Sequence, residues 1–234
     1  TYQHNRNPFV DHPEYVWAIW GPTPNDSRLY LGAVEPGDGA SAVAVDLGDV
    51  IKDGPLPGPQ SVTLNKSGAN PTTYDIALTG QASSTSAGTR QTFLGGVQSR
   101  SISVGLSAST ATVGLKTGSL TVDNTDLTSA SAGQGSTDGN DVANVSLRVL
   151  DHANASFDSA VDSNALTVDF GSVTVGTGLH TLNFTIYNLE SSPAFTAGLD
   201  LDSVAGAGDT SILTTDLAPF SNLAAGSNQA FSAS

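Results

Sequence analysis

The sequence contains neither cysteine nor methionine among its 234 residues, and lysine and arginine together number only 8. Without cysteine the chain forms no disulfide, offers no thiol nucleophile and cannot build a thiolate metal site. No apolar run approaches the roughly 18 residues of a membrane span, and no basic-then-apolar leader opens the chain. We therefore expect a processed or excised chain with no membrane span, whose stability rests on packing.

Basic residues are scarce as well, because 22 acidic residues face those 8 and give a formal net charge of −14. A surface of this sign repels the phosphates of nucleic acids and of anionic lipids, so we expect no direct nucleic-acid binding. The charge suits a bacterial protein exposed to salt water or divalent cations, or it serves solubility alone. The first alternative predicts an extracellular or cell-surface location.

Charged residues make up only 13% of the chain, which favours short strands and many turns over long exposed helices. From residue 29 onward, turn residues separate short runs with alternating or β-branched character. The runs are LYLGAV, SAVAVDLG, SVTLN, YDIALTG, SISVGLSAS, GSLTVDN and VANVSLRVL. Their spacing predicts an all-β chain of tandem immunoglobulin-like β-sandwich domains.

An internal repeat gives the domain organisation. The motif VDLGDV at Val45–Val50 returns as VDFGSV at Val168–Val173, 123 residues later, a distance that fits one sandwich domain. Two further pairs of segments follow in step: Ser61–Asn65 with Asn183–Asn188, and Tyr74–Leu78 with Phe195–Leu199. The repeat predicts an N-terminal segment and linker at 1–29, a first β-sandwich domain at 30–158 and a partial second one at 165–234.

The second copy is expected to be incomplete. Gln229–Ala233 resembles the start of the strand at Ser101–Ser107, and no counterparts of GSLTVDN and VANVSLRVL follow it. A half sandwich leaves an apolar face and strand edges open. Either the natural chain continues, or another chain supplies the missing strands by β-strand addition. The expected partners are then a second copy or a neighbouring chain, with self-association into fibres through strand edges, and a cell-surface or matrix component.

Residues 1–29 differ from the rest and hold both tryptophans, and Pro13 predicts the first turn of a short helix there. The run HNRNPFVDHPEYV within residues 4–20 resembles the C-terminal end of secreted bacterial endonuclease I-type nucleases. In that family the metal-binding and general-base residues lie well upstream of this run. The resemblance therefore implies a nuclease domain before Thr1 and no catalytic group in these residues.

The run VDFGSVTVG followed by LNFTIYNL in the second copy resembles the choice-of-anchor domains and the related ASPM, SPD-2 and Hydin class. Such β-sandwich domains are appended to large secreted bacterial proteins. The resemblance implies a spacer or surface-attachment module without known chemistry. We therefore expect a non-catalytic, extracellular structural or anchoring module. The alternative is an accessory part of a metal-dependent secreted endonuclease whose catalytic domain lies upstream of residue 1.

No catalytic residues are expected, since no Gly-x-Ser-x-Gly elbow occurs and His152 and His180 have no evident triad partners. A candidate metal site lies in the loop Ser136–Asp141. Asp138, Asn140 and Asp141 place oxygen ligands beside a glycine, as the start of a calcium loop does. The bidentate acidic residue that closes such a loop is missing, so the alternative is an ordinary Asp-Gly turn. No other cofactor is expected.

Overall fold

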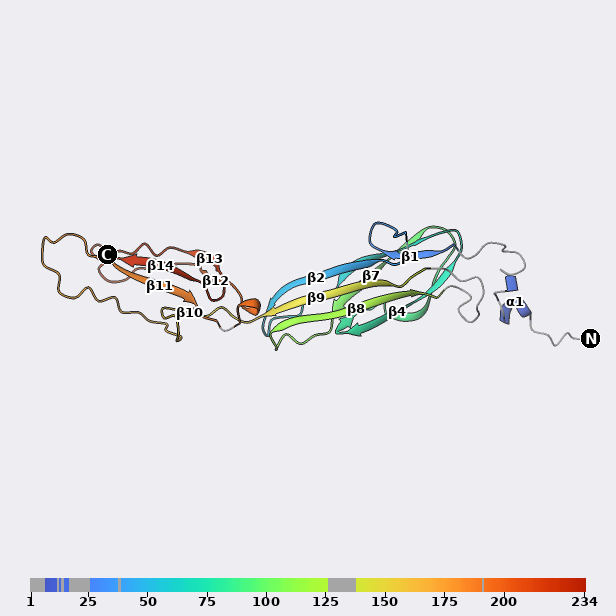
Figure 1. The fold of residues 1–234 in the computed structure, drawn as a ribbon, viewed down its shortest axis with the longest axis horizontal. Coiled ribbons are helices and arrows are strands. Elements are labelled where there is room, and N and C mark those ends of the chain that lie inside the picture. The colour runs from blue at the N-terminus through green and yellow to red at the C-terminus, as the bar shows by residue number, and fades with distance from the viewer. Residues whose placement is uncertain are drawn as a thin grey trace, which may run out of the picture. The chain divides into compact units, whose positions relative to one another are not determined.

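The computed structural model describes residues 7–11, 13, 15–16, 26–37, 39–125, 138–190 and 192–234. Within them the chain forms 14 β-strands, a four-residue helix and one short 3-10 helix, which confirms the all-β prediction (Figure 1). The chain divides into two compact units. Unit 1 comprises residues 1–50, 55–109 and 115–148, and unit 2 comprises residues 51–54, 110–114 and 149–234.

Unit 1 is a β-sandwich of two sheets. The first sheet has the strand order β1 (Arg28–Leu31), β3 (Gln60–Ser67), β7 (Gln98–Leu106) and β5 (Ala82–Ser83). The second has the order β2 (Ala42–Ile51), β9 (Asp141–Leu150), β8 (Gly114–Asn124), β4 (Thr72–Gly80) and β6 (Gly88–Phe93). Figure 1 shows β2, β9, β8 and β4 side by side in that order.

Alternation of side chains builds the core of unit 1. Along β9, every second residue is buried, because successive side chains of a strand point to opposite faces of the sheet. The apolar residues that β8 and β9 bury to 2% exposure or less are Leu120, Val122, Ala143, Val145, Leu147 and Val149. Tyr74 of β4 and Phe93 of β6 stack with ring centroids 5.2 Å apart and are fully buried as well.

The directions of the strands in the second sheet are fixed by individual pairings. Strand β4 runs antiparallel to β8, with Ile76 opposite Val122. Val142 donates its N–H to the carbonyl of Ser41, and Lys52 donates to that of Leu150, so residue numbers rise together and β2 runs parallel to β9. A β-hairpin of β8 and β9 thus lies between β4 and β2 in this sheet.

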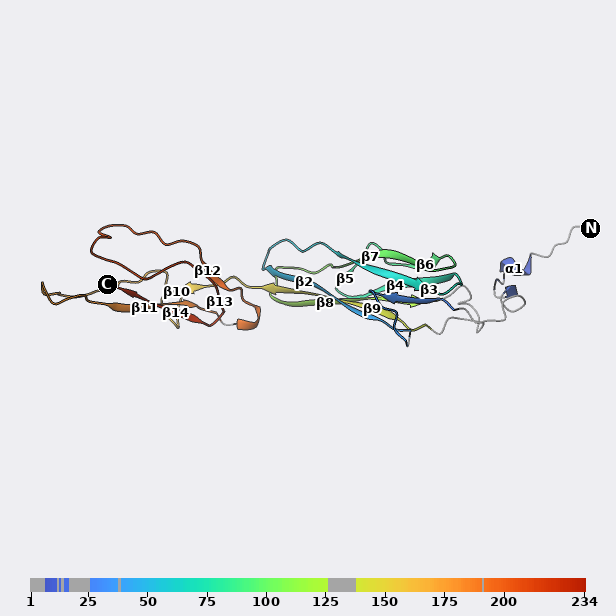
Figure 2. The same cartoon turned by 90° about the horizontal axis from the view of Figure 1, so that it is seen from above.

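Unit 2 contains fewer strands. One sheet has the order β10 (Ala155–Ser156), β11 (Leu182–Asn188) and β14 (Asn228–Ala233), and the other pairs β12 (Leu199–Leu201) with β13 (Phe220–Leu223). Four rings form a chain of contacts with centroid distances from 5.8 to 6.3 Å, in the order Phe157, Phe184, Phe231 and Phe220. Figure 2 shows the long stretch between β10 and β11 without any strand arrow.

The N-terminal segment is described only in part. Its helix α1 spans Pro8–Asp11, and the side chain of Asn7 accepts the N–H of Phe9 at 3.0 Å, which caps the helix. Pro8 occupies the first helical position, where its missing N–H costs nothing. This turn lies ahead of the helix expected from Pro13. Tyr15 and Val16 are helical, and the continuation of the expected helix lies outside the described residues.

Candidate functional site

The predicted calcium residues lie at the start of β9. Asp141 is the first residue of that strand and is fully buried. Its Oδ1 atom accepts two hydrogen bonds from Ser41, one from the backbone N–H at 2.8 Å and one from the hydroxyl at 2.6 Å. The carboxyl group therefore ties the start of β9 to the residue just before β2.

Asp138 makes a similar connection to β1. Its Oδ2 atom accepts the N–H of Leu29 at 2.5 Å and a side-chain N–H of Asn124 at 2.9 Å. Gly39 lies against it, because a Cβ atom built at Gly39 would approach Asp138 Oδ1 to 3.0 Å. The φ angle of Gly39 is 76°, a conformation that glycine adopts without strain.

Burial sets the electrostatics of this pair. Desolvation raises the pKa of Asp141 to about 6, although both hydrogen bonds from Ser41 act to lower it and the nearby Asp138 acts to raise it. Burial likewise raises the pKa of Asp138, against the hydrogen bonds from Leu29 and Asn124 and the charge of Arg28. Two carboxyl groups therefore share a partly desolvated site in which negative charge is costly.

The structure brings Asp138 and Asp141 together, whereas the side chain of Asn140 is exposed. The Oδ2 atom of Asp141 is buried and accepts no hydrogen bond from the described residues. Across those residues, no three or more His, Asp or Glu side chains converge as metal ligands would. In the structure, the two carboxyl groups connect β1, the residue before β2 and the start of β9 by hydrogen bonds. Calcium binding by Asp138, Asn140 and Asp141 stays a prediction.

A second feature is a β-bulge that occurs once in each unit and that the sequence does not predict. In unit 1, Asp75 accepts the N–H of Arg90 at 2.6 Å, and Arg90 has a φ of 52°. In unit 2, Asp200 accepts the N–H of Asn222 at 2.5 Å, and Asn222 has a φ of 57°. Left-handed conformations are uncommon outside glycine, so the coincidence marks β12 and β13 as counterparts of β4 and β6.

The position of the bulge shows that one of the predicted matches between the two copies of the repeat is wrong. Both pairings shift register there, between Tyr74 and Ile76 in unit 1 and between Leu199 and Leu201 in unit 2. Leu199 is therefore the counterpart of Tyr74, and the predicted match of Phe195 with Tyr74 is wrong by four residues. Phe195 instead ends the 3-10 helix Pro193–Phe195, which the proline begins.

The first sheets of the two units correspond closely in one strand. Strands β3 and β11 differ at one of seven matched positions in their burial pattern, and in that alignment Leu64 matches Ile186 and Lys66 matches Asn188. Lys66 and Asn188 are both fully buried. The ammonium of Lys66 donates to the carbonyls of Ser67, Gly68 and Gly96, and the amide of Asn188 donates to those of Ala197 and Leu223.

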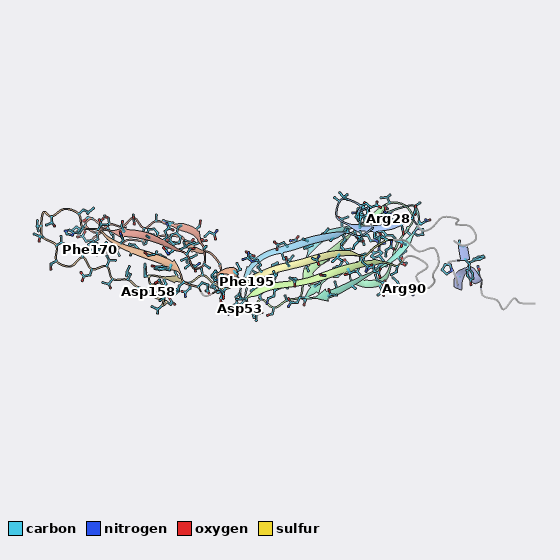
Figure 3. All side chains as sticks on the ribbon, in the orientation of Figure 1. Arg28, Asp53, Arg90, Asp158, Phe170 and Phe195 are labelled. Carbon is cyan, nitrogen blue, oxygen red and sulfur yellow. The ribbon has the colours of Figure 1, made fainter. Side chains whose placement is uncertain are left out.

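The repeated VD-x-G motif keeps its local structure in both copies. Asp46 accepts the N–H of Gly48 at 2.9 Å, and Asp169 accepts the N–H of Gly171 at 2.7 Å. Both glycines have positive φ angles, 82° and 63°. The motif lies within strand β2 in unit 1, whereas Val168–Val173 forms no strand. Figure 3 labels Phe170 of that segment on a stretch without an arrow.

These correspondences show what unit 2 lacks. Thr215 bridges Ala233 of β14 as β5 pairs with β7, so each strand of the first sheet has a counterpart. In the second sheet, β12 and β13 are the counterparts of β4 and β6. Val168–Val173 is the counterpart of β2, but it is not paired with a strand. No described strand of unit 2 corresponds to β8 or β9. This confirms the prediction that the second sandwich is incomplete.

The incomplete sandwich leaves its interior open. A cavity of about 200 Å³ lies between the two sheets of unit 2. Its apolar lining includes Ile186 of β11, Leu199 and Leu201 of β12 and Phe220 of β13. Leu199 and Leu201 are only partly buried, whereas their counterparts Tyr74 and Ile76 are buried. The interior of unit 2 therefore retains apolar surface that unit 1 covers.

We compared the chain with known proteins. No family model matches it, and no curated protein matches it. Among solved structures, it is similar to the crystal structure of CBD12 from CALX1.2, with a TM-score of 0.30 and 11% sequence identity. The likeness covers 88% of this chain and 73% of that one. Among the described residues, no helix is long and apolar enough to cross a membrane.

Proposed function

We propose that the chain is a non-catalytic structural module of a secreted multidomain protein, in which β-sandwich units space or anchor other parts at the cell surface. The observation that carries this proposal is the repetition of one strand arrangement in two units, down to the bulges at Arg90 and Asn222. Repeated units whose conserved contacts hold backbone segments together are typical of spacers. The choice-of-anchor resemblance supports an anchoring role.

The extracellular location is part of the same proposal. The net charge of −14 supports it, because an acidic surface stays soluble in the presence of salt and divalent cations. The same charge disfavours direct contact with nucleic acid. We propose a cell-surface or matrix component as one partner, and a second copy or a neighbouring chain, bound by β-strand addition and extending into fibres, as the other.

A retention assay tests the anchoring role. The purified chain, labelled at an exposed position, is incubated with washed bacterial envelope, and the bound fraction is measured after washing at increasing salt. We expect retention well above that of an unrelated acidic β-sandwich protein of similar size, which is the control. Equal binding of the two proteins would remove the anchoring role and leave only the spacer.

The alternative function is assistance to a metal-dependent secreted endonuclease, as the resemblance of residues 4–20 implies. A plasmid-nicking assay with added magnesium or calcium separates the two functions. We expect no cleavage beyond that of a heat-denatured sample. Nicking that a chelator abolishes would favour the nuclease-associated function instead.

Calcium is a second candidate, favoured by one observation. The buried Oδ2 atom of Asp141 accepts no hydrogen bond from the described residues, and Asp138 adds a second carboxyl group close by. A divalent cation is the kind of ligand that offsets the cost of such buried charge. We propose weak calcium binding at Asp138, Asn140 and Asp141. Isothermal titration at neutral pH tests it, with Asp141→Asn as the variant expected to abolish the signal.

A further inference from the structure

Strand β12 has an open edge. Among the described residues it is hydrogen-bonded to β13 alone, whereas its counterpart β4 pairs with β6 on one side and with β8 on the other. The counterpart of β2, Val168–Val173, is likewise hydrogen-bonded to none of the described strands. By correspondence with the order β2, β9, β8 and β4 in unit 1, the two strand positions between β12 and Val168–Val173 have no occupant among the described residues of unit 2. We call this pair of positions the two-strand gap.

We infer that the two-strand gap binds an antiparallel β-hairpin of the β8–β9 type, supplied by a neighbouring chain. The inference rests on the proposed function, and it names the class of polypeptide that strand addition brings to this chain. The hairpin's first strand pairs with β12, and its second strand pairs with Val168–Val173, which then becomes a strand.

The segment Val168–Val173 already has part of the local structure of β2. Its Asp169–Gly171 turn already has the geometry of the Asp46–Gly48 turn in β2. Its Val173 side chain is nevertheless 47% exposed, whereas Val168 and Phe170 are partly buried. A strand forms when a partner satisfies its backbone groups and covers its apolar face. The absence of a β9 counterpart therefore explains why this segment is not a strand while β2, with nearly the same sequence, is one.

The chemistry of the hairpin follows from unit 1. There, Val122 of β8 lies opposite Ile76 of β4, and both are buried. By correspondence, the first strand of the hairpin places an apolar residue opposite Leu201, over the cavity that Leu201 lines. The second strand continues the alternation, as Val145 and Leu147 do in β9. The recognised hairpin thus has apolar residues at every second position on the face turned to the cavity.

Other occupants satisfy the gap less well. A single strand added to β12 fills one of the two positions, and Val168–Val173 then stays unpaired. Direct pairing of two β12 edges from two copies has the same defect and involves only the three residues Leu199–Leu201. A hairpin satisfies both edges and covers the apolar cavity at once.

A fusion protein tests the inference. Residues 107–150 of unit 1, which contain β8, β9 and the connector that precedes them, are added directly after Ser234. Hydrogen–deuterium exchange is then measured by mass spectrometry on the 234-residue chain and on the fusion. We expect exchange in peptides covering residues 168–173 and 199–201 to slow by about 100-fold or more in the fusion, as in the strands of a folded sheet.

Two variants control this experiment. The first carries Val122→Asp and Val145→Asp in the added copy only, and the second carries Leu201→Asp in unit 2. Both are expected to return the two segments to fast exchange while peptides from unit 1 keep their original rates. Protection that survives both variants would show that the added residues act elsewhere.

The inference is overturned if the unmodified fusion leaves both segments exchanging as fast as in the 234-residue chain. It is also overturned if β12 in that chain is already protected in a concentration-dependent way, because a second copy would then occupy the edge. Neither result depends on envelope retention, so failure of this inference is distinguishable from failure of the anchoring role.

Discussion

The carboxylate of Asp200 accepts the backbone N–H of Asn222 at 2.5 Å and so holds a non-glycine residue at a φ of 57°. Asp75 does the same for Arg90 at the corresponding bulge of unit 1. The interaction matters because a bulge leaves one N–H outside the ladder of the sheet, and the carboxylate supplies its missing acceptor. It is also the contact that most clearly identifies β12 and β13 of unit 2 as the counterparts of β4 and β6 of unit 1.

Replacement of Asp75 by alanine tests the value of this contact. We expect Asp75→Ala to lower the free energy of unfolding by about 1–2 kcal/mol, because the N–H of Arg90 loses its acceptor. Asp75→Asn keeps an acceptor oxygen and is expected to stay within about 0.5 kcal/mol of the natural chain. Urea unfolding followed by circular dichroism measures both. Equal losses in the two variants would point to the charge rather than to the hydrogen bond.

Lys66 provides a test of buried polar contacts. Its ammonium donates to three backbone carbonyls from a fully buried position. We expect Lys66→Met to cost about 2 kcal/mol or more, because these carbonyls lose their donor without gaining water. Lys52→Met removes the same charge from a half-buried side chain and serves as the matched control. A Lys66→Met protein as stable as the control would contradict this account of Lys66.

Gly39 and Gly37 form a matched pair in one loop. We expect Gly39→Ala to destabilise the fold by about 1–2 kcal/mol, because φ is positive there and the new Cβ would press on Asp138 Oδ1. A Cβ at Gly37 meets nothing within 4 Å, so Gly37→Ala is expected to change stability by less than about 0.5 kcal/mol. Thermal melts of the two variants decide the question; a reversed order would show that the loop does not press on Asp138.

The Asp141 carboxyl gives stability a pH dependence. Its pKa is raised to about 6 in the folded chain, from 3.8. Between these values the folded state holds a proton that the unfolded state has lost, so the contribution to stability is full below pH 4 and disappears as pH rises through 6. The raised pKa of Asp138 acts in the same direction. Asp141→Asn is expected to flatten this fall, as measured by melting temperature from pH 4 to pH 7.

Calcium would change that profile if it binds at Asp138 and Asp141. A cation favours the ionised carboxylates, so added calcium is expected to raise the melting temperature at pH 7 and to have little effect at pH 4.5. Magnesium, which demands a tighter octahedral set of ligands, is expected to give a smaller shift and serves as the comparison. An equal shift in Asp141→Asn would place the effect at another site.

The seven runs predicted from residue 29 onward coincide with β1, β2, β3, β4, β7, β8 and β9, because alternation is a local signal, whereas β5 and β6 were not predicted. The bulges could not be predicted, since nothing in the sequence indicates that an arginine at residue 90 adopts a left-handed conformation. Side-chain type alone aligns Phe195 with Tyr74, whereas the register of the strands makes Leu199 the counterpart of Tyr74.

The sequence singles out Asp138 and Asp141 as neighbours, but it does not indicate the residues that hydrogen-bond to them. Leu29 and Ser41 lie 109 and 100 residues away along the chain, so only the folded sheet brings them to the carboxyl groups. Asn140, equally plausible from its neighbours in sequence, is exposed. Spacing along a loop predicts which residues are near one another, whereas burial is decided by segments distant in the chain.

The parallel course of β2 beside β9 has a consequence for how selective unit 2 can be. A ligand that fills the two-strand gap must be antiparallel to β12 at one edge and parallel to Val168–Val173 at the other. The two strands of a β-hairpin meet both requirements, whereas a single extended peptide does not. A single β-strand from another polypeptide would pair with only one of these two neighbours. The two-strand gap therefore selects its ligand by strand direction as well as by hydrophobicity, and this selectivity limits aggregation through the open edge of β12.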